Sequence, residues 1–109
     1  MKNGKMKGVL SLNMFISDEA RKWFEEELML EQGDSLRFFV KYGGCSSVQQ
    51  GFSLGIHKEA PKDPTLSVEI NGITYFIEHV DAWYLDDHDL YVNYDHDLEE
   101  PAYEYKKTS

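Results

Sequence analysis

The chain has few of the residues that cross-link or stiffen a polypeptide. Its 109 residues include one cysteine and three prolines. Because a single cysteine cannot form an internal disulfide, nothing indicates a secreted, cross-linked scaffold, and we expect a reducing cytoplasm. No stretch approaches the roughly 18 apolar residues of a membrane helix. The basic start, residues 1–7, lacks the apolar segment and cleavage site of a signal peptide. We therefore expect no membrane association.

Positive charge is also scarce. Eleven Lys and Arg residues stand against 20 Asp and Glu residues, so the formal net charge is −9. Such a surface repels phosphate backbones and anionic lipids unless a local basic patch intervenes, and the sequence has no such patch. We expect no nucleic-acid partner and predict protein partners with basic surfaces.

Apolar and aromatic residues are plentiful. They make up 41% and 14% of the chain, which is typical of a folded protein with one small core. Residues 1–13 lack periodicity and are predicted to be a flexible N-terminal arm or extension. The core domain is predicted over 14–98, followed by an acidic and aromatic C-terminal tail over 99–109. We therefore expect one domain with two appended segments.

The first periodic segment predicts an amphipathic helix from Asp18 to Glu31. Ser17 is the candidate N-cap, because its hydroxyl can accept a hydrogen bond from a free amide of the first turn. Gly33 is the candidate stop, since glycine enters the left-handed conformation without a Cβ penalty. The apolar positions repeat at helical spacing: Ala20, Trp23, Phe24 and Leu28.

After this helix the period changes from 3.6 to 2. Alternating apolar residues predict strands over 36–42 and 50–58, separated by a glycine-rich turn. The two prolines in 59–64 predict a loop. Residues 80–86 are predicted to form a short helical turn or an irregular crossing, and 89–94 the last strand.

Asn71-Gly72 gives the strongest hairpin signal, because a type I′ turn needs positive φ at both central residues. The implied register pairs apolar residues on one side of the hairpin. These pairs are Ile70 with Ile73, Val68 with Tyr75, and Leu66 with Ile77.

The turn Gly43-Gly44-Cys45 carries the only cysteine of the chain. Amides around Gly43 and Gly44 could form an anion-binding nest, and Lys41 is close in sequence; both would favour a thiolate at Cys45. Cys45 is therefore the candidate metal ligand or reactive thiol. The alternative is a small, half-buried residue of a tight turn.

Other polar and aromatic groups have two interpretations each. Asp86-Asp87-His88-Asp89 and Asp95-His96-Asp97 have the chemistry of metal ligands, but solvated acidic loops are the favoured interpretation. His79, on the inward side of its strand, and His57 are predicted to be structural. For the aromatic residues late in the chain, packing in the core and at its rim is favoured over an exposed partner surface: Trp83, Tyr84, Tyr91, Tyr94, Tyr103 and Tyr105.

Several of these features together resemble the HesB-like, or A-type iron–sulfur carrier, family. The residues that carry the resemblance are Arg37, Val40-Lys41, Gly43-Gly44-Cys45-Ser46, Gly72 and Tyr84-Leu85-Asp86, with Ala102-Tyr103-Glu104-Tyr105 further on. The resemblance implies a mainly β (α+β) fold, a pseudo-barrel of mixed strands with an N-terminal amphipathic helix. It also implies that Cys45 corresponds to the family's first cysteine. The family's C-terminal Cys-Gly-Cys is absent here.

The missing thiols limit what the resemblance implies about function. Iron–sulfur clusters are normally held by four ligands, mostly thiolates, so two copies of this chain would supply only two. We predict a non-enzymatic domain related to iron–sulfur cluster assembly or iron binding. Its cofactor would be iron or a cluster at Cys45, and its partners would be assembly components or a second copy in a homodimer. The alternatives are an interaction domain that has lost its metal and a thiol redox sensor that uses Cys45.

Overall fold

The computed structural model describes residues 12–45 and 50–107, which form two mixed β-sheets with helices at their ends. One sheet has the order β3 (Gln50–Lys58), β2 (Ser35–Cys45), β5 (Ile73–Glu78) and β4 (Pro64–Ile70). The other has the order β1 (Met14–Ile16), β6 (His88–Asp95) and β7 (Glu100–Lys107). The mainly β fold class predicted from the sequence is confirmed.

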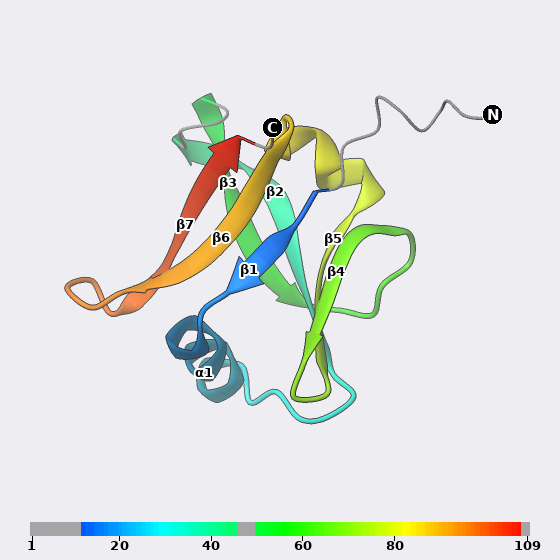
Figure 1. The fold of residues 1–109 in the computed structure, drawn as a ribbon, viewed down its shortest axis with the longest axis vertical. Helices are drawn as coiled ribbons and strands as arrows, with labels where there is room; N and C mark the ends of the chain where they lie inside the picture. Colours follow the sequence, from blue (N-terminus) through cyan, green and yellow to red (C-terminus); the bar gives the residue numbers. More distant parts are fainter. Residues whose placement is uncertain (1–11, 46–49, 108–109) are drawn as a thin grey trace.

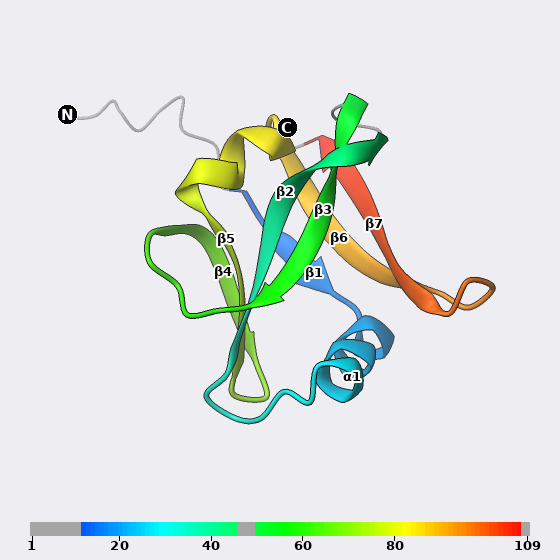
Figure 2. The ribbon, with the colours of Figure 1, turned by 180° about the vertical axis from the view of Figure 1, so that it is seen from behind.

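The two sheets face each other across a single apolar core (Figures 1 and 2). The ring of Phe38, from β2, lies 6.1 Å from the ring of Tyr103, from β7, in an edge-to-face arrangement. Helix α1 (Asp18–Glu27) lies at one end of the molecule, and the 3₁₀ helix η2 (His79–Leu85) lies at the other. Within residues 12–45 and 50–107 the strands form two separate sheets, so no closed barrel results.

The start of α1 is as predicted, but its end is not. The Ser17 hydroxyl accepts a hydrogen bond from the Ala20 amide at 3.1 Å, which is the expected N-cap. The helix ends four residues early, because Met29, with φ 50°, takes the left-handed position. The Leu30 amide then donates to the Glu25 carbonyl, which closes a Schellman motif. The prediction that Gly33 ends the helix is therefore wrong; its amide bonds to the Gly72 carbonyl instead.

The hairpin of β4 and β5 has the predicted register. Asn71 and Gly72 have φ values of 54° and 78°, as a type I′ turn requires. The paired residues are Ile70 with Ile73, Val68 with Tyr75, and Leu66 with Ile77. A Cβ at Gly72 would lie 2.9 Å from Cγ of Gln32, so both conformation and space favour glycine here.

Both ends of the described chain are tied into the three-stranded sheet. β7 pairs with β6 from His88↔Lys107 to Asp95↔Glu100, so the prediction that residues 89–94 form the last strand is wrong. At the other end, β1 pairs in parallel with β6, and the Leu90 amide donates a hydrogen bond to the Asn13 carbonyl. Residues 1–11 of the predicted arm lie outside the described part of the chain. No helix in the described residues has the length and apolar character that crossing a membrane requires.

Candidate functional site

The backbone of the glycine–cysteine segment lies at the end of the β2–β3 hairpin. Regular pairing runs to Tyr42↔Phe52, shifts, and resumes at Cys45↔Gln50. Gly43 has φ 102°, in the region that favours glycine, which agrees with the expected turn chemistry. The side chain of Cys45 and residues 46–49 lie outside the described structure. The predicted roles of Cys45 as a ligand and of Gly43 and Gly44 as a nest stay predictions.

The other candidate metal ligands do not converge. Among the described side chains, no group of three or more His, Cys, Asp or Glu residues is arranged to hold a metal ion. His88 bonds through Nδ1 to the carbonyl oxygens of Leu85 and Asp86, while Nε2 of His96 lies 3.0 Å from Glu19. The favoured interpretation was solvated acidic loops, but His88, Asp89 and Asp95 lie within β6, and only the residues just outside that strand are in loops.

His79 departs from its predicted place on the inward side of a strand. β5 ends at Glu78, so His79 begins η2; it is exposed, and its Nδ1 lies 3.2 Å from Oγ1 of Thr65. The buried residue at this junction is Glu78, whose carboxylate accepts the amides of Lys62 and Asp63 at 3.0 and 2.9 Å. The prediction of an inward His79 is therefore wrong, because the strand ends one residue before it.

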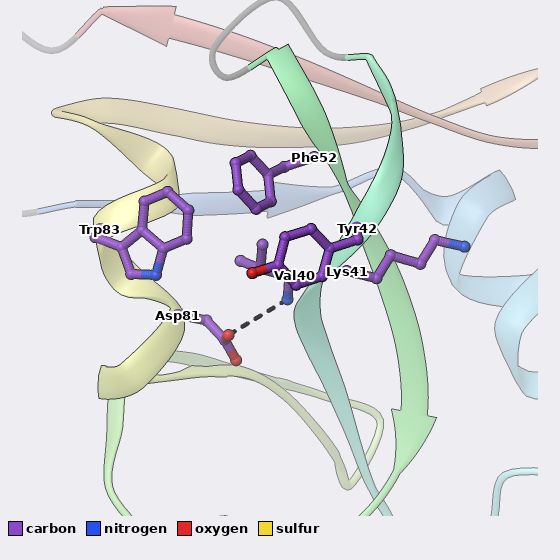
Figure 3. Close-up of a pocket in the computed structure, with 6 residues that line it drawn as sticks. All are labelled: Val40, Lys41, Tyr42, Phe52, Asp81 and Trp83. Carbon is purple, nitrogen blue, oxygen red and sulfur yellow. Dashed lines mark hydrogen bonds between the residues drawn. The ribbon is translucent and has the colours of Figure 1, made fainter.

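A small hollow lies beside the end of the β2–β3 hairpin, and we call it the aromatic hollow (Figure 3). It has a volume of about 170 Å³ and is lined by Val40, Lys41, Tyr42, Phe52, Asp81 and Trp83. The ring of Phe52 lies 5.2 Å from that of Tyr42 and 5.3 Å from that of Trp83. Figure 3 shows the amine of Lys41 directed away from these rings. The hollow is thus bounded mainly by aromatic rings and one carboxylate.

That carboxylate belongs to Asp81, which is 9% exposed and joins η2 to β2. Its Oδ2 accepts a hydrogen bond from Nη2 of Arg37 at 2.8 Å. Its Oδ1 accepts a hydrogen bond from the Val40 amide at 3.4 Å, which Figure 3 shows. Arg37 also pairs with Glu59, with 3.2 Å between Nη1 and Oε2. The hydrogen bond to Asp81 raises the pKa of Arg37, although partial burial opposes the shift. One guanidinium is therefore shared by two carboxylates.

The strand topology explains why Asp81 occupies this place. β5 pairs with β2 only from Ser35 to Arg37, so the β2 edge is open beyond that point. A free edge amide in a partly buried place needs an acceptor, and Asp81 supplies one to Val40 as η2 crosses the edge. η2 is anchored further by buried Tyr84, whose hydroxyl lies 3.2 Å from that of Tyr105.

The sequence did not predict that rings from three separate segments would line one hollow. Tyr42 alternates with Leu36 and Phe38 on one face of β2, yet it is 88% exposed while they are fully buried. Trp83 is 50% exposed, whereas Tyr84 beside it is fully buried, and both positions fall within the packing in the core and at its rim that was predicted for the late aromatic residues. Arg37 lies within an otherwise apolar strand, and a buried guanidinium requires an anionic partner. The sequence could therefore have predicted that a carboxylate such as Asp81 lies beside Arg37.

The chain is similar to several known proteins. The model of a family described as "Iron-sulphur cluster biosynthesis" matches residues 12–100. A Bacillus subtilis (strain 168) protein named "Pyruvate dehydrogenase inhibitor" is 55% identical over 95 residues, which cover 87% of this chain and 100% of the relative. An uncharacterized Staphylococcus saprophyticus protein is 36% identical over 91 residues, 81% of this chain and 93% of its own. An uncharacterized Staphylococcus haemolyticus protein is 34% identical over 88 residues, covering 77% and 89% respectively.

Proposed function

Because the chain belongs to the iron–sulphur cluster biosynthesis family, with its HesB-like fold, we propose that it uses this domain to bind and inhibit pyruvate dehydrogenase in the cytoplasm. The observation that carries the proposal is the 55% identity to the Bacillus subtilis protein of that name, over that protein's full length. Inhibition then results from protein–protein contact rather than from a reaction catalysed by this chain.

Two properties of the chain support a binding role. The aromatic hollow exposes Tyr42 and Trp83, and these residue types are enriched among the strongest contributors to protein interfaces. The net charge of −9 favours rapid association with a positively charged surface. The single cysteine leaves the domain with one thiolate where a cluster needs several, so the proposal rests on the exposed surface and not on a metal site.

The test is to titrate the purified protein into pyruvate dehydrogenase from the same organism and to follow the rate of pyruvate oxidation. We expect saturable inhibition and a complex that elutes as one species on size exclusion. Protein unfolded by heat is the control for non-specific effects. Unchanged activity at saturating protein, with no complex, would contradict the proposal.

A second candidate function is binding of iron or an iron–sulfur cluster through Cys45, which the family membership and the position of Cys45 on β2 favour. Anaerobic reconstitution with iron and sulfide, followed by visible absorption, tests it against the Cys45→Ser variant. Metal uptake that depends on Cys45 supports this function; equal spectra for both proteins rule it out. Inhibition by Cys45→Ser at the wild-type level would show that the first function needs no metal at this residue.

A further inference from the structure

The aromatic hollow has the size of a binding site for one side chain. Its volume is about 170 Å³. A water molecule takes roughly 30 Å³ of liquid, so the hollow has room for about five or six waters. Sites for cofactors and drug-sized ligands begin at about 300 Å³. The hollow is therefore too small for a cofactor but suits the end of one long side chain.

The lining selects for a planar cation. Tyr42, Phe52 and Trp83 provide three rings whose π faces carry partial negative charge, and such rings attract a cation within about 6 Å. A guanidinium also stacks on aromatic faces, which a compact ammonium does not do. An uncharged aliphatic side chain would use only the apolar part of this surface.

The carboxylate in the hollow adds the matching charge. A carboxylate has about four lone-pair positions, and Asp81 uses two, for Arg37 and for the Val40 amide. Because Arg37 is shared with Glu59, the three groups together carry an excess negative charge. Lys62 lies 4.0 Å from Glu59 but is 80% exposed, so its compensating effect is screened by water. Lys41 directs its amine away from the rings (Figure 3).

We propose that the aromatic hollow binds one arginine side chain of the protein that this chain inhibits, with the guanidinium stacked among Tyr42, Phe52 and Trp83 and facing Asp81. The proposal rests on the proposed function, because it names the chemistry by which the partner is recognised. It places the contact surface at the end of the β2–β3 hairpin and η2, rather than over α1.

The first test compares two exposed aromatic residues on different surfaces. Trp83, 50% exposed, lines the hollow, whereas Phe15, 48% exposed, stacks on Tyr91 of the three-stranded sheet. We expect Trp83→Ala to weaken binding to pyruvate dehydrogenase at least about tenfold, as for an interface hot spot, and Phe15→Ala to change it less than about twofold. Thermal unfolding of both variants verifies that they are folded. Equal losses for the two variants, or no loss for Trp83→Ala, would overturn the proposal.

The second test identifies the occupant and needs no enzyme. Arginine amide and citrulline amide have nearly the same shape and the same α-amino group, but only the side chain of the first is charged. In the ¹⁵N-labelled protein with Trp23→Phe, the one remaining indole N–H signal belongs to Trp83. We expect arginine amide to shift this signal in a saturable way and citrulline amide to shift it several times less. Equal shifts would show that the hollow does not recognise the charge of the guanidinium and would overturn the proposal, and no shift with either compound would show that the hollow is not a binding site.

The two tests separate failure of this proposal from failure of the proposed function. If wild-type protein neither binds nor inhibits pyruvate dehydrogenase, the proposed function is wrong, and the indole titration still decides whether the hollow takes a guanidinium. If wild-type protein inhibits but Trp83→Ala inhibits equally well, the function stands and the assignment of the hollow is wrong.

Discussion

Two sets of aromatic rings, each containing one residue of β2, differ in what covers them. The inner set contains Phe24, Phe38 and Tyr75, with ring centroids 5.7 to 6.5 Å apart, and all three side chains are fully buried. The outer set, in the aromatic hollow, contains Tyr42, Phe52 and Trp83 at 5.2 and 5.3 Å. Ring packing is similar in both, so contact between rings does not by itself distinguish a core from a binding surface.

The difference arises from the length of β2. Phe38 and Tyr42 are four residues apart, so they point to the same side of the strand. Phe38 is covered by α1 and by the facing sheet, through Phe24 and Tyr103. The strand continues beyond this cover to Cys45, with β3 paired to one edge and η2 bonded to the other through Asp81 and Val40. We expect the inner rings to determine stability and the outer rings to determine binding.

The largest expected effect is on the inner set. Phe38→Ala removes a fully buried ring and leaves a cavity, and such a change costs about 3–5 kcal/mol. Chemical denaturation monitored by circular dichroism measures the loss. A cost near that of a surface substitution would show that Phe38 is not part of a closed core, and the contrast between the two sets would disappear.

The next effect concerns the ion pair that holds η2 against β2. Asp81→Asn leaves the largely buried Arg37 with Glu59 alone and weakens the link to Val40, so we expect a loss of about 2–3 kcal/mol. Equilibrium denaturation gives the value. Glu59→Gln is the matched control, because it removes a carboxylate from the same guanidinium but leaves η2 attached. A larger loss for Glu59→Gln would mean that Glu59, not Asp81, is the main partner of Arg37.

A smaller loss of stability is expected in the outer set. Trp83→Ala removes edge-to-face contacts with Phe52 and Tyr84, which are worth about 1 kcal/mol in a half-exposed place. Thermal unfolding, compared with Phe38→Ala under identical conditions, tests the comparison directly. Similar losses for the two variants would show that the hollow is part of the core.

The smallest effect at neutral pH is expected for Tyr75→Phe. The Tyr75 hydroxyl is buried with no hydrogen-bond partner among the described residues, so its removal should stabilise the protein by roughly 0.5 kcal/mol. Burial, with a further contribution from Glu25, raises the pKa of Tyr75 to about 12, whereas an unfolded tyrosine titrates near 10.

The raised pKa of Tyr75 gives this variant a signature in alkali. Because the folded protein resists ionisation of Tyr75, its contribution to stability is complete below about pH 10 and is lost as the pH rises through about 12. Tyr75→Phe should therefore unfold at higher pH than wild type when far-UV circular dichroism is followed against pH. Tyr42→Phe controls for loss of an exposed hydroxyl. An unchanged alkaline transition would contradict burial of the Tyr75 ring.

Local signals predicted much of the fold. Asn71-Gly72 set the turn and thereby the register of β4 and β5, because positive φ at two adjacent residues is a strong local preference. Ser17 set the start of α1 for the same kind of reason. The end of α1 was predicted wrongly, since Met29 takes a backbone conformation that its residue type disfavours. Met29 is itself exposed, but the next residue, Leu30, is buried and its amide bonds to the Glu25 carbonyl, so contacts after Met29 accompany the early end of the helix.

Local signals could not predict which strands pair when those strands are far apart in the chain. β1 is three residues long and pairs with residues 90–92, and in β7 only two apolar side chains, Tyr103 and Tyr105, alternate with charged residues. In the candidate site, too, some features follow from local sequence and others from long-range contacts. Turn glycines and a lone cysteine are visible in a sequence, but Asp81 meets Arg37 from 44 residues away.

The residues alone thus specified a small acidic mainly β domain, the β4–β5 turn and the beginning of its helix, because each depends on neighbours within a few positions. Folding decided which aromatic residues are buried, where Asp81 is placed, and that residues 14–16 and 100–107 are strands. These features depend on contacts between segments far apart in the chain, whose free energy exists only when the two sheets and η2 come together.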